Sequence, residues 1–169
     1  YLPRCMSAFV GADITTALLA SGICSKPDTR MLVDIGTNGE IALWHRGQLS
    51  CCSTAAGPAF EGAGLSMGMA GKTGAVDHVR VQDGALQAHV IGGGAPKGIC
   101  GSGVIDALAC LVELEQLDET GLLEQDPAPV APPVCLTQKD VRMVQLAKSA
   151  ICAGLSTLLR VEGLCGADA

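Results

Sequence analysis

The spacing of apolar residues along this chain alternates between the 3.6-residue period of helices and the two-residue period of strands. The pattern predicts helices at residues 12–21, at 101–115 and from 137 to about 162, and the small-residue stretch 55–74 is expected to be a loop with one helix. Gly22 directly follows the first helix, where a terminating glycine belongs. Thr137 occupies the N-cap position of the last helix and Asp140 falls in its first turn, which indicates where that helix begins.

Short runs rich in β-branched and apolar residues predict strands between these helices. Three of them, at residues 31–34, 40–45 and 48–52, are joined by tight turns with the sequences GTNG and RG. A second hairpin is expected over residues 74–92, around an Asp83-Gly84 turn. The Pro-rich stretch 126–133 is incompatible with a helix and predicts a stiff connector. This order of elements is typical of a mixed α/β domain.

Composition excludes several classes of function. Eleven basic and seventeen acidic residues give a net charge of −6, whereas nucleic acids and anionic membranes are bound by clustered Lys and Arg. No apolar run reaches the ~18 residues of a membrane span. We therefore expect neither a nucleic acid nor a membrane as partner. The first residue is Tyr1, and the chain enters with YLPRC, which suggests a piece of a longer protein.

Nine cysteines suggest disulfides or a metal site, but their spacing does not support either. The sequence has no C-x-x-C pair and no histidine at a ligand spacing from a cysteine. Cys110 and Cys152 lie within predicted helices, where cysteine acts as a small buried hydrophobe. The odd count also fits poorly with a secreted disulfide framework. We expect structural thiols in a reducing cytoplasm.

Two glycine-rich segments are weak candidates for a phosphate site. SMGMAGKTG, residues 66–74, contains Gly-Lys-Thr, but Ser66 stands where a Walker A loop needs glycine, and no strand leads into the loop. Residues 92–103 lack the glycine order of a dinucleotide fingerprint. They do end at a predicted helix N-terminus, which favours an anion. The alternative for residues 92–103 is a loop that only packs tightly.

The segment LVDIGTNGEIALW, residues 32–44, is the strongest candidate. Asp34 ends a strand that we expect to be buried, where a carboxylate needs a partner such as hydrated Mg²⁺. The turn that follows, Gly36, Thr37, Asn38 and Gly39, has backbone N–H groups and a hydroxyl for phosphate oxygens. The residues alone leave two alternatives equally open. The turn either holds a phosphate or is a plain hairpin in which Asp34 accepts turn amides.

A resemblance to a known family favours the phosphate site. DIGTNGE with its flanking strands resembles a phosphate motif of the acetate and sugar kinase/Hsp70/actin superfamily. The wider chain resembles the C-terminal ATPase-like domain of the reductive activators of corrinoid proteins. The motifs that carry this resemblance are FVGAD (9–13), LVDIGTNGEIAL (32–43), CSTAAGPAFEGA (52–63), GICGSGVIDALA (98–109) and TQKDVRMVQLAKSAICAG (137–154). The implied fold is an actin-like, ribonuclease H-like ATPase lobe with a mixed sheet flanked by helices.

Departures from the family pattern limit what this chain holds. The first phosphate hairpin of the family, another D-I-G-T, is absent here, and so is the adenosine-binding A-G-G-F-G loop after the last helix. The [2Fe–2S] cluster of the family belongs to an N-terminal ferredoxin-like domain, and these residues contain no C-x₄-C-x₂-C for it. We therefore expect residues 1–169 to be a single partial domain, most of the second lobe.

The same comparison implies roles for individual carboxylates. Asp13 follows Gly11 and opens a helix, and in related sugar kinases an aspartate in a similar context is the base for the attacking group. Carried over, Asp13 would orient the water that attacks the γ-phosphate. The alternative is that Asp13 is only the N-cap of the helix at 14–21. Glu61 is expected to cap or face solvent, and Asp106 to lie in the first turn of its helix, where a negative charge is favourable.

The resemblance implies a protein that uses ATP with Mg²⁺ to drive reduction of Co(II) to Co(I) in a corrinoid partner. Two alternatives remain open from the sequence. One is a small-molecule kinase of the same superfamily, although aromatic residues for sugar stacking make up only 2% of the chain. The other is a module that binds nucleotide or a partner without turnover. The isolated chain is expected to be inactive, because it lacks the other parts of the nucleotide cleft.

Overall fold

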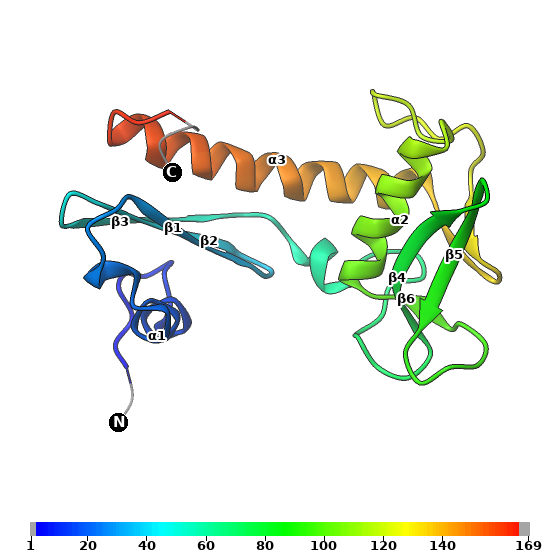
Figure 1. Cartoon of the computed structure of the whole chain (residues 1–169), viewed down its shortest axis with the longest axis horizontal. Coiled ribbons are helices and arrows are strands. Elements are labelled where there is room, and N and C mark those ends of the chain that lie inside the picture. Colours follow the sequence, from blue (N-terminus) through cyan, green and yellow to red (C-terminus); the bar gives the residue numbers. More distant parts are fainter. Residues whose placement is uncertain (1–2, 166–169) are drawn as a thin grey trace. The chain divides into compact units, whose positions relative to one another are not determined.

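The structure is a computed structural model that describes residues 3–165, and these form two compact units (Figure 1). The first unit contains the described residues up to Gly57 and those from Lys148 onward, and the second contains Pro58–Ala147. The long helix α3 (Gln138–Val161) contributes its beginning to the second unit and the rest to the first. No helix within residues 3–165 combines the length and the apolar character that crossing a bilayer requires.

The first unit is a three-stranded antiparallel sheet with helices on both faces. Its strands are β1 (Arg30–Ile35), β2 (Gly39–His45) and β3 (Gln48–Thr54), in the order β1-β2-β3. Helix α1 (Ala12–Ser21) and a short 3₁₀ helix η1 (Ile23–Ser25) precede them. The three predicted strands and the predicted helix are confirmed, and Gly22 ends α1 in the left-handed conformation with φ 63°.

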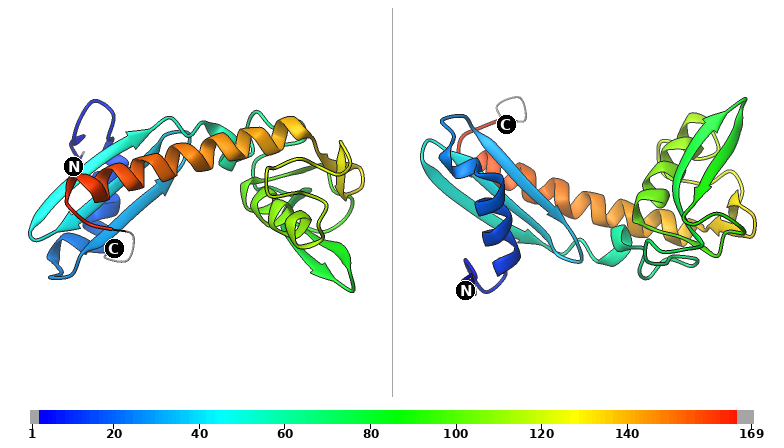
Figure 2. Two further views of the ribbon diagram at one scale, coloured as in Figure 1. Left: turned by 90° about the horizontal axis from the view of Figure 1, so that it is seen from above. Right: turned by 60° about the horizontal axis from the view of Figure 1, so that its bottom comes forward.

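Side chains alternate between the two faces of the sheet along each strand, and helices cover both faces. Helix α1 and the C-terminal part of α3 lie on opposite faces (Figure 2). On the α1 face, Ala42 packs with Ile14 and Leu18. On the α3 face, Ile41 and Leu43 pack with Leu158. Because successive side chains of β2 point to opposite faces, this central strand is buried from Gly39 to Leu43.

The turns of this sheet differ in kind. Arg46-Gly47, between β2 and β3, has φ values of 49° and 80°, which is the left-handed pair of a two-residue hairpin turn. The Asn38-Gly39 pair is not such a turn. Gly39 lies in β2, paired with Ile35, and the loop consists of residues 36–38. A Cβ on Gly39 would come within 2.5 Å of Thr54 Oγ1 and 3.0 Å of Ile151 Cγ1, so glycine is needed here for close packing.

The second unit contains a small mixed sheet and a helix that covers it. The hairpin of β4 (Ala75–Gln82) and β5 (Ala85–Val90) turns at Asp83-Gly84, with φ values of 52° and 74°. A two-residue strand β6 (Gly98–Ile99) pairs parallel to β4. Helix α2 (Gly101–Glu113) follows β6 directly. The predicted hairpin and helix are confirmed.

Two predictions for this unit differ from the structure. The stretch 55–74 holds only one short 3₁₀ helix, η2 (Pro58–Glu61), because Gly62 and Gly64 after it adopt positive φ, which ends any helix. The Pro-rich stretch holds a strand, β7 (Ala128–Ala131), which pairs antiparallel with β8 (Val134–Leu136). Proline is tolerated in β7 because this sheet has two strands, so each strand keeps an edge free of ladder hydrogen bonds.

The start of α3 is held by a buried carboxylate. Asp140 is 1% exposed, and its Oδ2 accepts hydrogen bonds from the Thr137 backbone N–H and hydroxyl, both at 2.8 Å. Its Oδ1 accepts from the Ser66 N–H at 2.8 Å and from the Ser66 hydroxyl at 3.1 Å. Thr137 Oγ1 in turn accepts from the Asp140 N–H at 3.2 Å. The N-cap predicted from the sequence is therefore confirmed, and it also ties the loop at Ser66 to α3.

The glycine-rich segment 92–103 packs tightly at the start of α2. A Cβ on Gly101 would meet the carbonyl oxygen of Phe60, and one on Gly103 would meet that of Val76. A Cβ on Gly98 would lie 2.7 Å from the Met67 carbonyl oxygen. These glycines therefore allow close approach of backbones around the N-terminus of α2, as the packing alternative expected.

Candidate functional site

The loop 36–38 and the end of β1 leave Asp34, Thr37 and Asn38 exposed. The sequence analysis expected Asp34 to end a buried strand, and this is wrong. β1 is an edge strand whose last three residues are all exposed, and it continues one residue further to Ile35. Asp34 therefore needs no buried partner, and its carboxylate is accessible to a ligand from solvent.

The loop is anchored to the exit of β3. The Thr37 carbonyl oxygen accepts a hydrogen bond of 2.8 Å from the Gly57 N–H. Thr54 Oγ1 donates one of 3.1 Å to the Gly39 carbonyl oxygen. Gly36 thus begins and Gly39 follows a short loop that is fixed to β3 and its exit, while the side chain of Asn38 is exposed. The five predicted binding residues, Asp34 and Gly36 to Gly39, lie together in one β1–β2 connection.

Strand register places two carboxylates side by side. Asp34 in β1 lies directly opposite Glu40 in β2, and Glu40 lies opposite Ser53 in β3. Leu32 and Ala42, two residues away from Asp34 and Glu40, pack in the α1 core. Because residues i and i+2 of a strand share a face, Asp34 and Glu40 belong to the α1 face of the sheet.

Asp13 approaches the same face from α1. The helix begins at Ala12 with Gly11 as its N-cap, so the alternative that Asp13 is the N-cap is wrong. Asp13 lies in the first turn, where Oδ1 accepts a 2.8 Å hydrogen bond from the Ile14 N–H. The side chain folds back over Gly11, where a Cβ would come within 2.5 Å of Oδ1. Gly11 therefore makes room for the Asp13 carboxylate.

Glu40 is the carboxylate that sequence reasoning missed. Its side chain is buried, with 9% exposed. Burial raises the pKa of the Glu40 carboxyl, the negative charges of Asp13 and Asp34 raise it further, and a hydrogen bond from its own backbone N–H lowers it. Asp34 lies opposite Glu40 in the ladder, and Asp13 precedes Ile14, which packs with Ala42 on the same face of the sheet. The sequence did contain a signal for it, because Glu40 is a charged residue directly before the apolar run IALW.

The carboxylates near the loop limit which metal ions could bind there. Within residues 3–165, no three His, Cys, Asp or Glu side chains are close enough together to hold an ion directly. Mg²⁺ usually keeps several of its waters and takes one or two carboxylates. Of the two carboxylates paired beside the loop, Asp34 and Glu40, only Asp34 is exposed, and a single exposed carboxylate is compatible only with an ion that keeps most of its waters.

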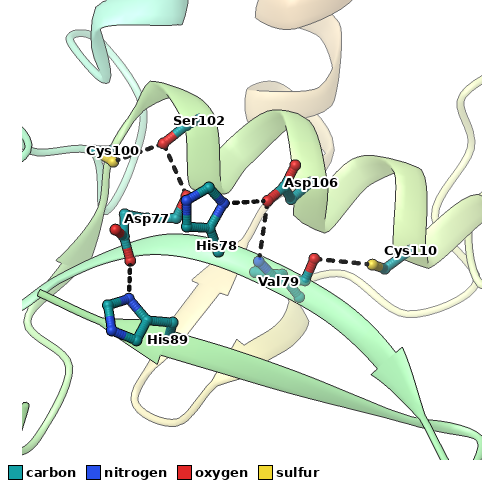
Figure 3. A network of polar contacts seen from close by, with 8 residues as sticks. All are labelled: Asp77, His78, Val79, His89, Cys100, Ser102, Asp106 and Cys110. Atoms are coloured by element: carbon teal, nitrogen blue, oxygen red, sulfur yellow. Dashed lines mark hydrogen bonds and ion pairs between the residues drawn. The ribbon is translucent and has the colours of Figure 1, made fainter.

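The second unit has a separate polar network along β4 (Figure 3). Asp106 in α2 accepts from the Val79 N–H at 3.3 Å and contacts His78 Nδ1 at 3.1 Å. Asp77 contacts His89 Nδ1 at 2.6 Å, and this hydrogen bond lowers the pKa of the Asp77 carboxyl. Of these residues, His78, Val79, His89 and Asp106 line part of a hollow of about 470 Å³. Asp106 lies beyond the first turn of α2, which holds no acidic residue, so its predicted dipole role is wrong.

A β-bulge creates this network. Val76 pairs with Val90 and His78 pairs with His89, which leaves Asp77 without an opposite residue. A bulge changes the direction of neighbouring side chains, so that Asp77 reaches His89 while His78 reaches α2. The network joins β5 to β4 and β4 to α2, and it belongs to the second unit alone. Glu61 lies in η2 and faces solvent, as one of its predicted alternatives stated.

Comparison with known proteins gives one consistent result. The family model described as the C-terminal domain of RACo, the ASKHA domain, matches residues 28–168. The corrinoid activation enzyme RamQ of Eubacterium limosum is 39% identical over 96% of this chain and 32% of its own length. The [Co(II) methylated amine-specific corrinoid protein] reductase of Methanosarcina barkeri is 30% identical over 96% of this chain and 34% of its own.

A solved structure agrees with these matches. The reductive activator for corrinoid, iron-sulfur protein superposes with a TM-score of 0.90 and 31% identity, over 99% of this chain and 30% of that one. The chain therefore spans about a third of the length of the relatives it matches. The predicted ASKHA-type α/β fold and the resemblance to corrinoid activators are both confirmed.

Proposed function

Since the chain belongs to the family of the C-terminal ASKHA domain of RACo, we propose that it is the nucleotide-binding lobe of an ATP-dependent reductive activator of a corrinoid methyl-transfer protein. The observation that carries this proposal is the match of 96% of the chain to two proteins whose names state corrinoid activation or reduction. Both units then belong to one partial ASKHA domain, since the family model spans them without a break.

The nucleotide phosphates would bind at the β1–β2 connection. Gly36, Thr37, Asn38 and Gly39 supply backbone N–H groups and the Thr37 hydroxyl, and the anchored loop keeps them in place. Asp34 would hold Mg²⁺ through water, since its exposed carboxylate stands beside the loop. Mg²⁺ when bound neutralises charge on the phosphate oxygens.

Asp13 would position the attacking water. Its carboxylate is on the same face as Asp34 and acts on Glu40 together with it. Water attacks the γ-phosphorus, the bond to the β,γ-bridging oxygen breaks, and ADP and phosphate are released. In such reactions catalysis consists mainly of positioning and charge stabilisation. Asp13, held by the Ile14 N–H, would supply the positioning part of this role.

The energy of ATP would drive an uphill electron transfer. Reduction of Co(II) to Co(I) is difficult for an ordinary ferredoxin-type cluster, so closure around ATP would bind and reshape the corrinoid partner. The [2Fe–2S] cluster that supplies the electron is proposed to lie outside this chain, in the parent protein. The described cysteines form no ligand group for it. We also propose a cytoplasmic location, which the nine free thiols support.

The direct test uses the whole protein with a purified Co(II) corrinoid protein. Formation of Co(I), followed by its visible absorbance, is expected to require a reductant, Mg²⁺ and ATP together. A non-hydrolysable ATP analogue separates the effect of binding from that of hydrolysis. ATP-independent reduction, or ATP-dependent phosphorylation of a small-molecule hydroxyl or carboxylate without any effect on cobalt, would contradict the proposal.

A further inference from the structure

The exposed face of the β4–β5 hairpin carries four polar side chains side by side. His78 lies directly opposite His89 in the ladder, and Arg80 lies opposite Gln87. Because residues i and i+2 of a strand share a face, all four project from the same side of the hairpin. These four side chains, the polar square, are exposed and line the hollow of about 470 Å³. The polar square is therefore one accessible surface.

We propose that the polar square is a binding site for a phosphate-type oxyanion. Arg80 supplies a fixed positive charge, and His78 and His89 supply two more hydrogen-bond donors when their rings are protonated. The site lies wholly within the second unit. It goes beyond the proposed function, which assigns the nucleotide phosphates to the β1–β2 connection of the first unit.

Two carboxylates orient the imidazoles for this role (Figure 3). Nδ1 of His78 contacts Asp106 Oδ2 at 3.1 Å, and Nδ1 of His89 contacts Asp77 Oδ1 at 2.6 Å. An ionised carboxylate only accepts hydrogen bonds, so Nδ1 carries a proton in both rings. Nε2 is then the nitrogen left for a ligand, and protonation of the ring turns it into a donor. The ring centroids are 6.5 Å apart, which is close enough for one ligand to contact both rings.

Arg80 is held in place by its cross-strand neighbour. Its Nε and Nη2 donate to Gln87 Oε1 at 3.3 and 2.9 Å. Among residues 3–165, Nη1 of Arg80 and the Nε2 amide of Gln87 have no acceptor, and Nε2 of either histidine has no partner. The planar guanidinium binds phosphate through several N–H groups at once. The polar square therefore offers a ligand nitrogens from all four of its side chains.

The charge of Arg80 decides between an anion and a cation. Two imidazoles whose Nδ1 atoms contact carboxylates also resemble ligands of a transition metal ion. Arg80 lies two residues after His78 on the same face, is always protonated and would repel such an ion. Within residues 3–165, no three His, Cys, Asp or Glu side chains are placed to hold a metal. An oxyanion is therefore the ligand that fits this face.

The neighbouring charges make this binding depend on protonation. Of the residues of α2, only Asp106 lines the hollow, and β7, which packs against β5, contains no charged residue. The remaining carboxylate is Asp77, which pairs with His89. When both imidazoles are protonated, the charges of the two His–Asp pairs cancel and Arg80 leaves the face positive. When both are neutral, the two carboxylates outweigh Arg80. The site is therefore expected to bind an anion in its protonated form.

Nitrogen NMR of the imidazoles tests the proposal on the isotope-labelled 169-residue chain. Inorganic phosphate, added at constant ionic strength, is expected to shift Nε2 of His78 and His89 with one common dissociation constant. His45 of the first unit, whose Nδ1 lies 2.8 Å from Thr29 Oγ1, is the internal control. If the signals of His78 and His89 shift no more than that of His45, the proposal is overturned.

A second titration identifies the source of the phosphate. The hollow of about 470 Å³ is larger than a phosphate ion needs, so a phosphate carried by a larger molecule also fits. Glycerol phosphate is therefore compared with inorganic phosphate in the same measurement. Tighter binding of the ester indicates a phosphorylated ligand, and equal binding indicates the free ion. Both results support the site, and absence of binding by either probe overturns it.

Arg80→Gln and Arg142→Gln form a matched pair of variants. Arg142 is an exposed arginine of the same unit that also bonds a glutamine, with Nη1 donating to Gln145 Oε1 at 3.0 Å. Arg80→Gln is expected to weaken phosphate binding at least about tenfold, because it removes a charge-assisted interaction. Arg142→Gln is expected to leave the affinity unchanged, and equal affinities of the two variants would overturn the proposal. If Arg80→Gln does not fold, His89→Gln replaces it, and wild-type affinity in that variant overturns the proposal equally.

Sulfate provides a readout of the imidazoles themselves, because its own charge does not change between pH 8 and pH 6. Sulfate binding to the wild-type chain is expected to strengthen as the pH falls over this range, since protonation turns both Nε2 atoms into donors. An affinity that does not depend on pH would overturn the role of His78 and His89. Zn²⁺ binding at Nε2 of both rings, with no shift on addition of phosphate, would show a cation site instead and overturn the proposal.

Discussion

Asp34 and Glu40 lie directly opposite each other in the β1–β2 ladder, one exposed to solvent and the other 9% exposed. The two carboxylates share the α1 face, but they have different surroundings because β1 is the edge strand and β2 is central. The exposed partner is accessible from solvent, while the buried one lies in the interior of the unit. This pair joins the β1–β2 connection to the rest of the sheet.

Replacing Asp34 tests the phosphate motif in the whole protein. Asp34→Ala is expected to reduce ATP turnover at least about tenfold, because it removes a carboxylate that holds Mg²⁺ through water. Melting is expected to change little, since the side chain is exposed and packs in no core. Phosphate release and thermal unfolding measure the two effects, with Asp28→Ala as the exposed control. Unchanged turnover with unchanged melting would exclude Asp34 from the site.

Replacing Asp13 is expected to affect ATP hydrolysis and nucleotide binding differently. Asp13→Asn keeps an oxygen that can accept from the Ile14 N–H, so α1 is expected to remain intact. Removal of the negative charge is expected to slow ATP hydrolysis while nucleotide binding persists. Single-turnover hydrolysis and equilibrium binding of Mg-ATP separate the two quantities. A parallel loss of binding and hydrolysis would show instead that Asp13 is a structural residue of the first turn.

The isolated chain is expected to bind ATP only weakly. Micromolar affinity corresponds to about −8 kcal/mol, and each charge-assisted hydrogen bond contributes only about 1.5–3 kcal/mol before the cost of association. A site made of one loop and its carboxylates is therefore expected to bind ATP with a dissociation constant in the millimolar range or weaker. The isolated chain is also expected to have no ATPase activity. Calorimetric titration of Mg-ATP into the chain measures this. A dissociation constant below about 10 μM would show that these residues hold a complete site.

The Asp77–His89 hydrogen bond predicts a pH dependence of stability. Because this bond holds the pKa of Asp77 below its ordinary value of 3.8, the unfolded chain binds the proton more readily than the folded one. The stabilisation is fully present above the ordinary value and disappears as the pH falls through the lowered pKa. Urea unfolding of the wild-type chain and Asp77→Asn from pH 6 to pH 2.5 should give free energies that converge at low pH. If the two unfolding free energies differ by the same amount at every pH, the Asp77–His89 hydrogen bond is not the cause of the pH dependence.

Gly39 is expected to be irreplaceable for packing. Gly39→Ala places a Cβ within 2.5 Å of Thr54 Oγ1 and 3.0 Å of Ile151 Cγ1, so β2, β3 or α3 must shift. Overpacking of this kind typically costs about 1–3 kcal/mol of unfolding free energy. Gly71→Ala is the matched control, because its Cβ would meet only Ile91 Cδ1, at 3.9 Å. Equal stability of the two variants in chemical denaturation would contradict the packing argument.

The local pattern of this sequence determined most of its secondary structure. Periodicity predicts α1, the first three strands, the β4–β5 hairpin, α2 and α3. Gly22 ends α1 through its backbone freedom, and Thr137 begins α3 through local hydrogen bonds. The two errors, in 55–74 and 126–133, fall where glycine and proline dominate. In 55–74 glycines with positive φ limit the helix to one short 3₁₀ turn, and in 126–133 pairing with β8 makes part of the stretch a strand.

The motif DIGTNGE and the family resemblance also came from the sequence alone, because a phosphate loop is a continuous run of residues. What only the tertiary structure decided is which carboxylates belong to the same face of the sheet and how exposed each of them is. Asp13, Asp34 and Glu40 come from a helix and two strands, and the strand register and the packing of α1 bring them to one face. Burial depends on whether a strand is central or at an edge, which no local pattern contains. For that reason the exposure of Asp34, the role of Gly39 and the position of Glu40 could be seen only in the folded chain.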